Sequence, residues 1–115
     1  MRLYDQALQT ESNNPLAWQG RALVQARRSE HRDALLSFER ALQLDPNLVT
    51  SLNGKGVALN LQHRNQEALE AFDRAILLEK DNVTAWNGKG AAQSALGMLE
   101  QAVTSFATSY DLLVA

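Results

Sequence analysis

Apolar and small residues recur at three- and four-residue intervals along most of the chain, and short polar stretches interrupt them. This spacing is typical of helices, whereas a half-buried strand would alternate at every second residue. The pattern therefore predicts an all-α fold of seven helices and no strand. We place these helices near residues 2–12, 15–28, 31–44, 49–62, 65–79, 83–96 and 99–113.

The polar interruptions have the chemistry of helix ends. In "SNNP", Asn14 precedes Pro15, which is the order of an N-cap residue followed by proline at the first helical position. In "DPN", Pro46 disfavours helical backbone in the residue before it, so the preceding helix is expected to end there. A third break, "KDN", occupies residues 80–82.

The chain repeats itself with a period of 34 residues. Such a period indicates stacked supersecondary units, each too small to bury its own apolar face. Each unit here contains two of the predicted helices. Four series of residues superimpose under this shift: Trp18, Leu52 and Trp86; Gly20, Gly54 and Gly88; Ala34, Ala68 and Ala102; Phe38, Phe72 and Phe106.

These residues resemble the tetratricopeptide repeat, a helix-turn-helix unit of this length. The matching features are Trp18 with a small residue four positions later, the Ala34-x-x-x-Phe38 pattern and the closing Asp45-Pro46. The resemblance divides the chain into repeats at 15–48, 49–82 and 83–115, with residues 1–14 as the second-helix remnant of a preceding repeat. It implies one right-handed superhelix of antiparallel helix pairs, whose first helices line a concave groove. It also implies that a protein or peptide segment, extended or helical, binds in this groove.

Two glycines in each "NGKG" stretch need an explanation, because a helical glycine costs about 1 kcal/mol relative to alanine. Residues two apart on a helix point in nearly opposite directions, so the two glycines of each pair have different surroundings. We expect Gly56 and Gly90 to let the first helix of a repeat approach the second closely. We expect Gly20, Gly54 and Gly88 to lie beside the groove, where larger residues would fit, and to leave room for a ligand or a neighbouring helix.

One face of each first helix should line the groove, because residues three and four apart share a face. Each stripe contains a side-chain amide, at Gln19, Asn53 and Asn87, and an amide can both donate to and accept from a peptide backbone. A solvated polar face without a ligand is the alternative. With Arg27 at the rim, the predicted site contains Leu16, Gln19, Gly20, Leu23, Arg27, Thr50, Asn53, Gly54, Val57, Asn60, Thr84, Asn87, Gly88 and Ala91.

The resemblance also argues against one class of ligand. Tetratricopeptide domains that hold the carboxylate tails of cytosolic chaperones use a clamp of Lys, Asn, Asn, Lys and Arg. The matching positions here are Gln19, Leu23, Gly54, Thr84 and Gly88, none of which is cationic. We therefore expect that this chain does not bind such a tail.

Arg21, Lys55 and Lys89 recur three residues after Trp18, Leu52 and Trp86. We interpret them as packing their stems, or making cation–π contacts, on the two tryptophans; the alternative is a cationic stripe that touches the ligand. His31 and His63 fall in turns between helices and are interpreted as solvated residues, not as metal ligands.

Composition narrows the remaining functions. The chain has 115 residues and a net charge of −2, which is one domain without the basic excess that nucleic-acid binding requires. It contains no cysteine, so we expect a reducing compartment, by default the cytoplasm. No apolar run approaches the roughly 20 residues of a membrane span. No catalytic constellation, cofactor motif or metal-ligand cluster is visible, so we expect no enzyme activity and no cofactor.

The two ends of the chain predict self-association, as a structural alternative to ligand binding. Repeat arrays bury each unit against the next, and their end units usually carry a polar cap. A fragment of a longer array would show the same ends. Apolar residues that would be left uncovered are Leu3, Tyr4 and Leu8 at one end, and Phe106, Tyr110 and Leu113 at the other. Residues expected to be mostly buried between layers are Trp18, Phe38, Leu42, Leu52, Leu59, Phe72, Ile76, Trp86, Phe106 and Tyr110.

Overall fold

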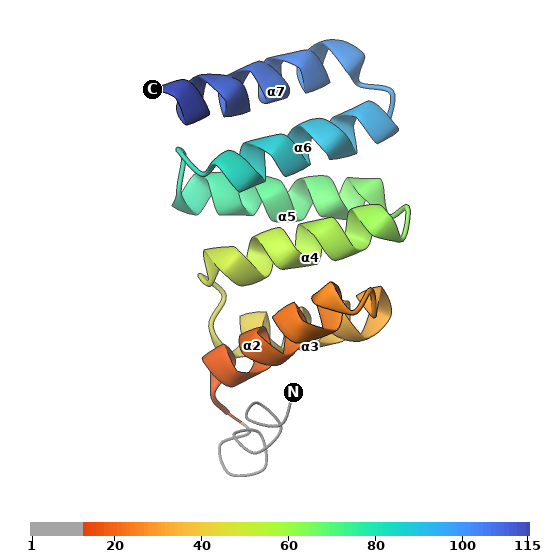
Figure 1. Cartoon of the computed structure of the whole chain (residues 1–115), viewed down its shortest axis with the longest axis vertical. Coiled ribbons are helices and arrows are strands. Elements are labelled where there is room, and N and C mark those ends of the chain that lie inside the picture. Colours follow the sequence, from red (N-terminus) through yellow and green to blue (C-terminus); the bar gives the residue numbers. More distant parts are fainter. Residues whose placement is uncertain (1–12) are drawn as a thin grey trace.

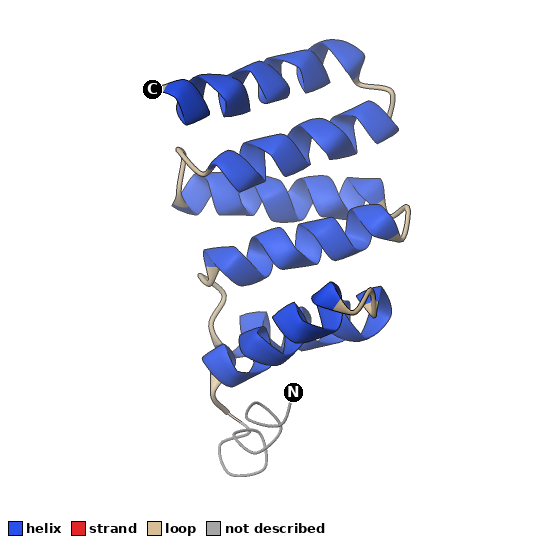
Figure 2. Ribbon diagram, in the orientation of Figure 1, coloured by secondary structure: helices blue, strands red, loops and turns tan. Residues whose placement is uncertain are grey.

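A computed structural model describes residues 13–115, and within them the chain forms six α-helices and no strand (Figures 1 and 2). All six helices are confirmed as predicted, with ends that differ by one residue at most. The remaining predicted helix, within residues 2–12 at the start of the chain, lies outside the described residues. The helices are α2 (Pro15–Arg27), α3 (His31–Leu44), α4 (Val49–Leu61), α5 (Asn65–Leu78), α6 (Val83–Ala95) and α7 (Leu99–Val114).

The helices pack as three antiparallel pairs in two layers (Figure 1). The first helices α2, α4 and α6 contact one another in sequence and form one layer. The second helices α3 and α5 each pack between the first helix of their own pair and that of the next pair. This stacking produces an elongated body in which each pair buries its apolar face on its neighbour.

The helix starts follow the predicted cap chemistry. Asn14 Oδ1 accepts hydrogen bonds from the backbone N–H groups of Leu16 and Ala17, at 2.9 and 3.4 Å, directly before Pro15. Asn82 Oδ1 caps α6 in the same way, by accepting from Ala85 N–H at 2.9 Å. Leu48 holds the equivalent place before α4 and makes no such bond, so the middle repeat begins without a side-chain cap.

Left-handed residues join the two helices of each pair. Ser29, His63 and Gly97 have φ angles of 62°, 61° and 81° and are spaced by the repeat period. This conformation ends a helix sharply, but a residue with a Cβ atom is strained in it. Only the third repeat therefore has glycine at this turn, where a residue without a Cβ atom is not strained.

Phenylalanine rings fill the space between the layers. Phe38 and Phe72 are 1% and 0% exposed. A Cβ atom added at Gly56 would lie 2.5 Å from the Phe72 ring, and one added at Gly88 would overlap the same ring from the next repeat. The Phe72 ring therefore fits between two glycines, one on α4 and one on α6.

This packing corrects the interpretation of the groove glycines. A Cβ atom at Gly54 would overlap the Phe38 ring, as one at Gly88 overlaps Phe72, so larger residues do not fit there. The expectation that larger residues would fit at Gly54 and Gly88 was wrong. Of the two expected neighbours, a ligand or a helix, the structure shows the helix, because each glycine accommodates an aromatic ring of the preceding repeat. Close approach at Gly56 is confirmed, although the Phe72 ring makes the contact.

The exposure of the last helix differs from the prediction at two positions. Phe106 and Tyr110 are 39% and 64% exposed, so the expectation that they are mostly buried was wrong. Phe38 and Phe72 are covered by the first helix of the following repeat, and α7 has no such helix after it in the described residues. Phe38, Leu52, Leu59 and Phe72 are buried, whereas Trp18, Leu42, Ile76 and Trp86 are half-buried.

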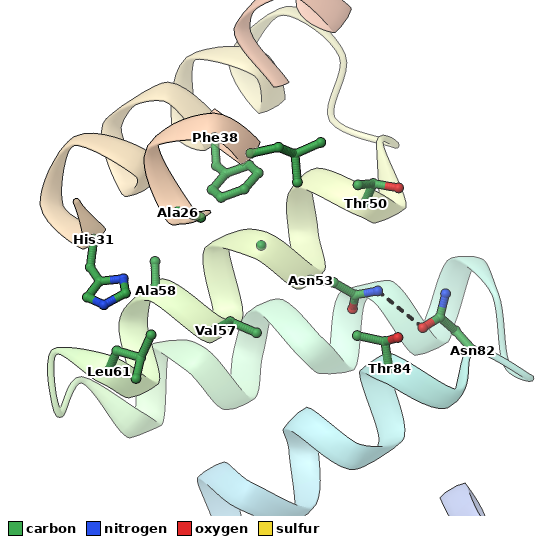
Figure 3. Close-up of a pocket in the computed structure, with 12 residues that line it drawn as sticks. Ala26, His31, Phe38, Thr50, Asn53, Val57, Ala58, Leu61, Asn82 and Thr84 are labelled. Atoms are coloured by element: carbon green, nitrogen blue, oxygen red, sulfur yellow. Dashed lines mark hydrogen bonds between the residues drawn. The ribbon is translucent and has the colours of Figure 1, made fainter. Parts of the chain in front are cut away.

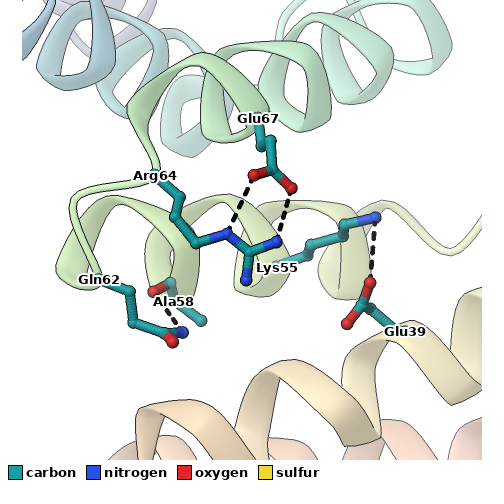
Figure 4. Close-up of polar contacts among 6 residues, drawn as sticks. All are labelled: Glu39, Lys55, Ala58, Gln62, Arg64 and Glu67. Atoms are coloured by element: carbon teal, nitrogen blue, oxygen red, sulfur yellow. Dashed lines mark hydrogen bonds and ion pairs between the residues drawn. The ribbon is translucent and has the colours of Figure 1, made fainter.

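The recurring cations contact the tryptophans, as predicted. The Arg21 guanidinium lies 6.0 Å from the Trp18 ring centre, and Lys89 Nζ lies 5.3 Å from that of Trp86. Two of the cations also form ion pairs that cross repeat boundaries. They are Lys55 with Glu39 at 3.8 Å, drawn in Figure 4, and Lys89 with Asp73 at 2.8 Å.

Candidate functional site: a hollow on the first-helix layer

A hollow of about 420 Å³ opens between α2 and α4 and reaches the start of α6 (Figure 3). Half of its lining residues come from α4, the central helix of the layer, because α4 has a first helix on each side. Its residues are Leu23, Ala26, His31, Phe38, Thr50, Asn53, Gly54, Val57, Ala58, Leu61, Asn82 and Thr84.

One end of the hollow is apolar. Leu23, Val57 and Leu61 line the hollow and remain exposed. Figure 3 shows Leu61 and His31 on the side away from Asn53. Exposed leucine and valine side chains that gather in a concavity are characteristic of binding surfaces. This end can take an apolar side chain of a partner.

The other end of the hollow is polar (Figure 3). Asn53 Nδ2 donates to Asn82 Oδ1 at 3.1 Å, while Asn82 also caps α6. Asn53 is only 8% exposed, and its Oδ1 atom has no hydrogen-bond partner within residues 13–115. Buried acceptors are rarely left unpaired. The exposed hydroxyl-bearing side chains of Thr50 and Thr84 lie beside it.

Two of the three predicted side-chain amides form hydrogen bonds that join neighbouring repeats. Ser51 Oγ donates to Gln19 Oε1 at 2.7 Å, which joins α4 to α2. Asn53 is held by Asn82, on the segment that leads into α6. Asn87 is exposed. Two of the three amides therefore hold neighbouring repeats together.

The structure brings only part of the predicted site together. Leu23, Thr50, Asn53, Gly54, Val57 and Thr84 line the hollow. The predicted residues that do not line it are Leu16, Gln19, Gly20, Arg27, Asn60, Asn87, Gly88 and Ala91.

The lining residues that the predicted site lacks are Ala26, His31, Phe38, Ala58, Leu61 and Asn82. Leu61 lies four residues after Val57, so extending the α4 stripe by one turn would have found it. Asn82 was recognised only as part of a helix break, and its second contact, with Asn53, joins residues 29 positions apart. No sequence signal indicates that contact.

The hollow carries little charge. None of its lining residues is Asp, Glu, Lys or Arg. Among residues 13–115 no group of three or more His, Cys, Asp or Glu side chains is arranged to hold a metal ion. None of the described helices is long and apolar enough to span a membrane. What the site offers chemically is apolar surface with neutral donors and acceptors.

The family model described as "Tetratricopeptide repeat" matches residues 2–49 and 50–112. The chain belongs to the tetratricopeptide repeat family. A search of the curated proteins found no match to it.

Solved tetratricopeptide structures have the same fold. "MamA 41-end from Desulfovibrio magneticus RS-1" superimposes with a TM-score of 0.90 at 21% identity, over 96% of this chain and 63% of that one. "Arabidopsis OM64 TPR domain" does so with 0.84 at 19% identity, over 85% and 81%. "Second TPR of Spaghetti (RPAP3) bound to HSP90 peptide SRMEEVD" gives 0.83 at 21% identity, over 93% and 98%. This chain spans 62% to 64% of three MamA chains.

Proposed function

We propose that this tetratricopeptide domain is a protein-interaction module, without enzyme activity, that binds a segment of a partner protein in the hollow. The observation that carries the proposal is the exposed apolar group of Leu23, Val57 and Leu61 beside the polar group around Asn53. A suitable segment, extended or helical, presents an apolar side chain to the first group and a neutral hydrogen-bonding group to the second. The Spaghetti domain, which was solved with an HSP90 peptide bound, shows that this fold can hold a peptide.

The ligand differs from a chaperone carboxylate tail. The peptide in the Spaghetti structure, SRMEEVD, is rich in acidic residues. Here the positions that correspond to the five clamp residues hold Gln19, Leu23, Gly54, Thr84 and Gly88, and no Lys or Arg lines the hollow. An uncompensated carboxylate loses its hydration on binding, which is unfavourable without a cation. The proposed ligand is therefore neutral where it contacts the hollow.

A peptide selection tests this function. The chain is used to select binders from a displayed random-peptide library, and their affinities are measured for wild type and for Leu23→Glu and Val57→Glu. Both positions are exposed, so the fold should tolerate the change while the hollow loses apolar surface. The matched control is Leu36→Glu, an exposed leucine on α3 that does not line the hollow.

We expect both hollow variants to weaken binding at least tenfold and the control to bind as wild type does. Raising the salt concentration should change the affinity little, because the contacts are neutral. Selected peptides that bind all three variants equally would refute the hollow as the site. A steep salt dependence would instead direct attention to Arg27, Lys55 and Lys89.

Self-assembly is a second candidate function, and a specific observation favours it. Apolar side chains are exposed along α7, including Phe106, Tyr110 and Leu113. The other predicted association residues, Leu3, Tyr4 and Leu8, lie outside the described residues. For either function we propose a cytoplasmic location, which the absence of cysteine supports.

A further inference from the structure

A continuous apolar stripe runs along the outer face of α7. Its residues are spaced by 4, 3, 4 and 3 positions, which is the spacing of a helix–helix seam. Their exposed fractions reach 63% for Leu99, 68% for Val103 and 69% for Leu113. The complete stripe is Leu99, Val103, Phe106, Tyr110 and Leu113.

This stripe differs from the same face of the inner helices. At the position of Leu99, α3 has His31 and α5 has Asn65. At the position of Leu113, the first two repeats have Asp45 and Glu79. In those repeats the polar residues limit the apolar face at both ends, whereas α7 is apolar at both.

A third change removes a charge from the same face. Glu39 and Asp73 pair with Lys55 and Lys89 of the following first helix. The equivalent position on α7 is Ala107. A following first helix of the kind found here would find no acidic partner on α7, so this face suits a neutral surface better than another such repeat.

Contact between like ends gives a closed two-fold dimer, whereas head-to-tail contact between copies gives an open stack. A mass that stops rising at the dimer therefore distinguishes the two arrangements.

We propose that the α7 stripe binds the α7 stripe of a second copy, as an antiparallel pair with its two-fold axis beside Phe106. Phe106 lies at the middle of the stripe, with a leucine seven residues away on each side. Turning one helix over therefore brings Leu99 of one copy near Leu113 of the other, and Val103 of one copy near Tyr110 of the other. The only charged residues of α7, Glu100 and Asp111, lie opposite neutral residues in this arrangement.

The size of the surface sets the expected strength. A helix of 16 residues is about 24 Å long, and stable interfaces bury about 800 Å² on each partner. A single helix face of this length offers an area at the lower end of what stable interfaces bury, so the dimer should dissociate on dilution. This proposal is independent of ligand binding in the hollow, which faces another side of the repeat stack.

Sedimentation of the 115-residue chain over a concentration series tests the surface. We expect the mass to rise toward a dimer and then stop, and Leu99→Glu with Leu113→Glu to raise the dissociation constant at least tenfold. The matched control is Leu36→Glu with Leu77→Glu, two exposed leucines on α3 and α5. Circular dichroism checks that each variant remains folded. A wild type that stays monomeric at its solubility limit, or a control that dissociates as readily, would overturn the proposal.

Thiol cross-linking tests the antiparallel arrangement, since the chain has no cysteine of its own. Ala107→Cys places a thiol beside the proposed axis, whereas Leu113→Cys places the two thiols of a dimer about 20 Å apart at 1.5 Å per residue. A short bismaleimide should therefore link Ala107→Cys into dimers and leave Leu113→Cys unlinked. Linking of both would indicate a parallel pair, and linking of neither would indicate another surface; either result overturns the arrangement.

Discussion

The middle repeat and the two outer repeats have the same backbone but different interiors. In the first repeat Ser37 Oγ donates to Gln25 Oε1 at 2.7 Å, and in the third Ser105 Oγ donates to Gln93 Oε1 at 2.6 Å. All four residues are buried. The middle repeat has Leu59 and Ala71 at these positions, and both are buried without any polar atom to satisfy.

The difference shows that these positions change as pairs. A buried hydroxyl without a partner costs about 1 to 3 kcal/mol, whereas replacing both partners by apolar groups is nearly neutral. The middle repeat carries the complete apolar version and the outer repeats the complete polar version. None of the three repeats contains a mixed pair, which would leave a buried polar side chain without its hydrogen-bond partner.

The position that Trp86 and Leu52 share in their repeats shows the same alternative: a polar atom with a hydrogen-bond partner, or no polar atom. Trp86 Nε1 donates to the carbonyl of Lys80 at 2.7 Å, which satisfies the polar atom of its ring. Leu52 takes this place in the middle repeat, where it is buried and needs no partner. At these three positions, Leu52, Leu59 and Ala71, the middle repeat is therefore apolar, and a repeat packs on each side of it.

Creating a mixed pair should have the largest effect on this comparison. Leu59→Gln loses the burial of a leucine and buries an unpaired amide, so we expect a loss of about 3 to 5 kcal/mol in unfolding free energy. Adding Ala71→Ser supplies the missing hydroxyl and should recover part of that loss. Urea denaturation of the two single variants and the double variant measures the coupling between them.

The reciprocal variants are the control. Gln25→Leu should cost about 1 to 3 kcal/mol, because it leaves the Ser37 hydroxyl without its acceptor, and Ser37→Ala should restore much of the stability. If the effects of either pair were simply additive, the positions would not behave as pairs, and the difference between the repeats would have another cause.

A smaller effect is expected where a ring contacts a glycine. Gly54→Ala overlaps the buried Phe38 ring, so overpacking of about 1 to 3 kcal/mol should exceed the roughly 1 kcal/mol that alanine gains in a helix. Gly90→Ala approaches Phe106 at 2.8 Å, but this ring is partly exposed and can move. Thermal unfolding should show Gly54→Ala destabilised and Gly90→Ala unchanged or stabilised; the opposite order would contradict the packing explanation.

The sequence predicts the helices well and the site only in part, for one physical reason. The helix ends depend on local chemistry, such as the caps at Asn14 and Asn82, and the repeat period carries the same ends over to the middle repeat, which has Leu48 at this place. The contacts that decide the site cross repeat boundaries. Gly54 is adjacent in space to Phe38, and Asn53 to Asn82, yet helix periodicity gives only the direction in which each side chain points.

The turn residues allow a finer comparison of the repeats. His63 has a φ angle of 61°, where a Cβ atom is strained, whereas the third repeat has Gly97 at this place. We expect His63→Gly to stabilise the fold by about 1 kcal/mol and Gly97→Ala to destabilise it by a similar amount. His63→Ala is the matched control, since it removes the imidazole but keeps the Cβ atom. Equal stability of the glycine and alanine variants at position 63 would show that the turn stores no strain.

The smallest effect is expected at an ion pair that only the middle repeat contains. Arg64 donates to both carboxylate oxygens of Glu67, at 3.0 and 2.7 Å (Figure 4), where the third repeat has Met98 and Gln101. These hydrogen bonds lower the pKa of the Glu67 carboxyl below its ordinary value, which lies near 4.3. A lowered pKa stabilises the fold above the pKa of the unfolded chain, and this contribution is lost as the pH falls through the folded value.

Both members of this pair are exposed, and exposed pairs contribute little. Glu67→Gln should therefore leave the stability at pH 7 within the error of urea denaturation. Because the contribution of the pair is already this small at pH 7, the wild type and the variant should also unfold alike below pH 4, where the wild type loses the pair. A clear loss at pH 7 would mean that Glu67 does more than pair with Arg64, and that the middle repeat depends on charge as well as on its apolar interior.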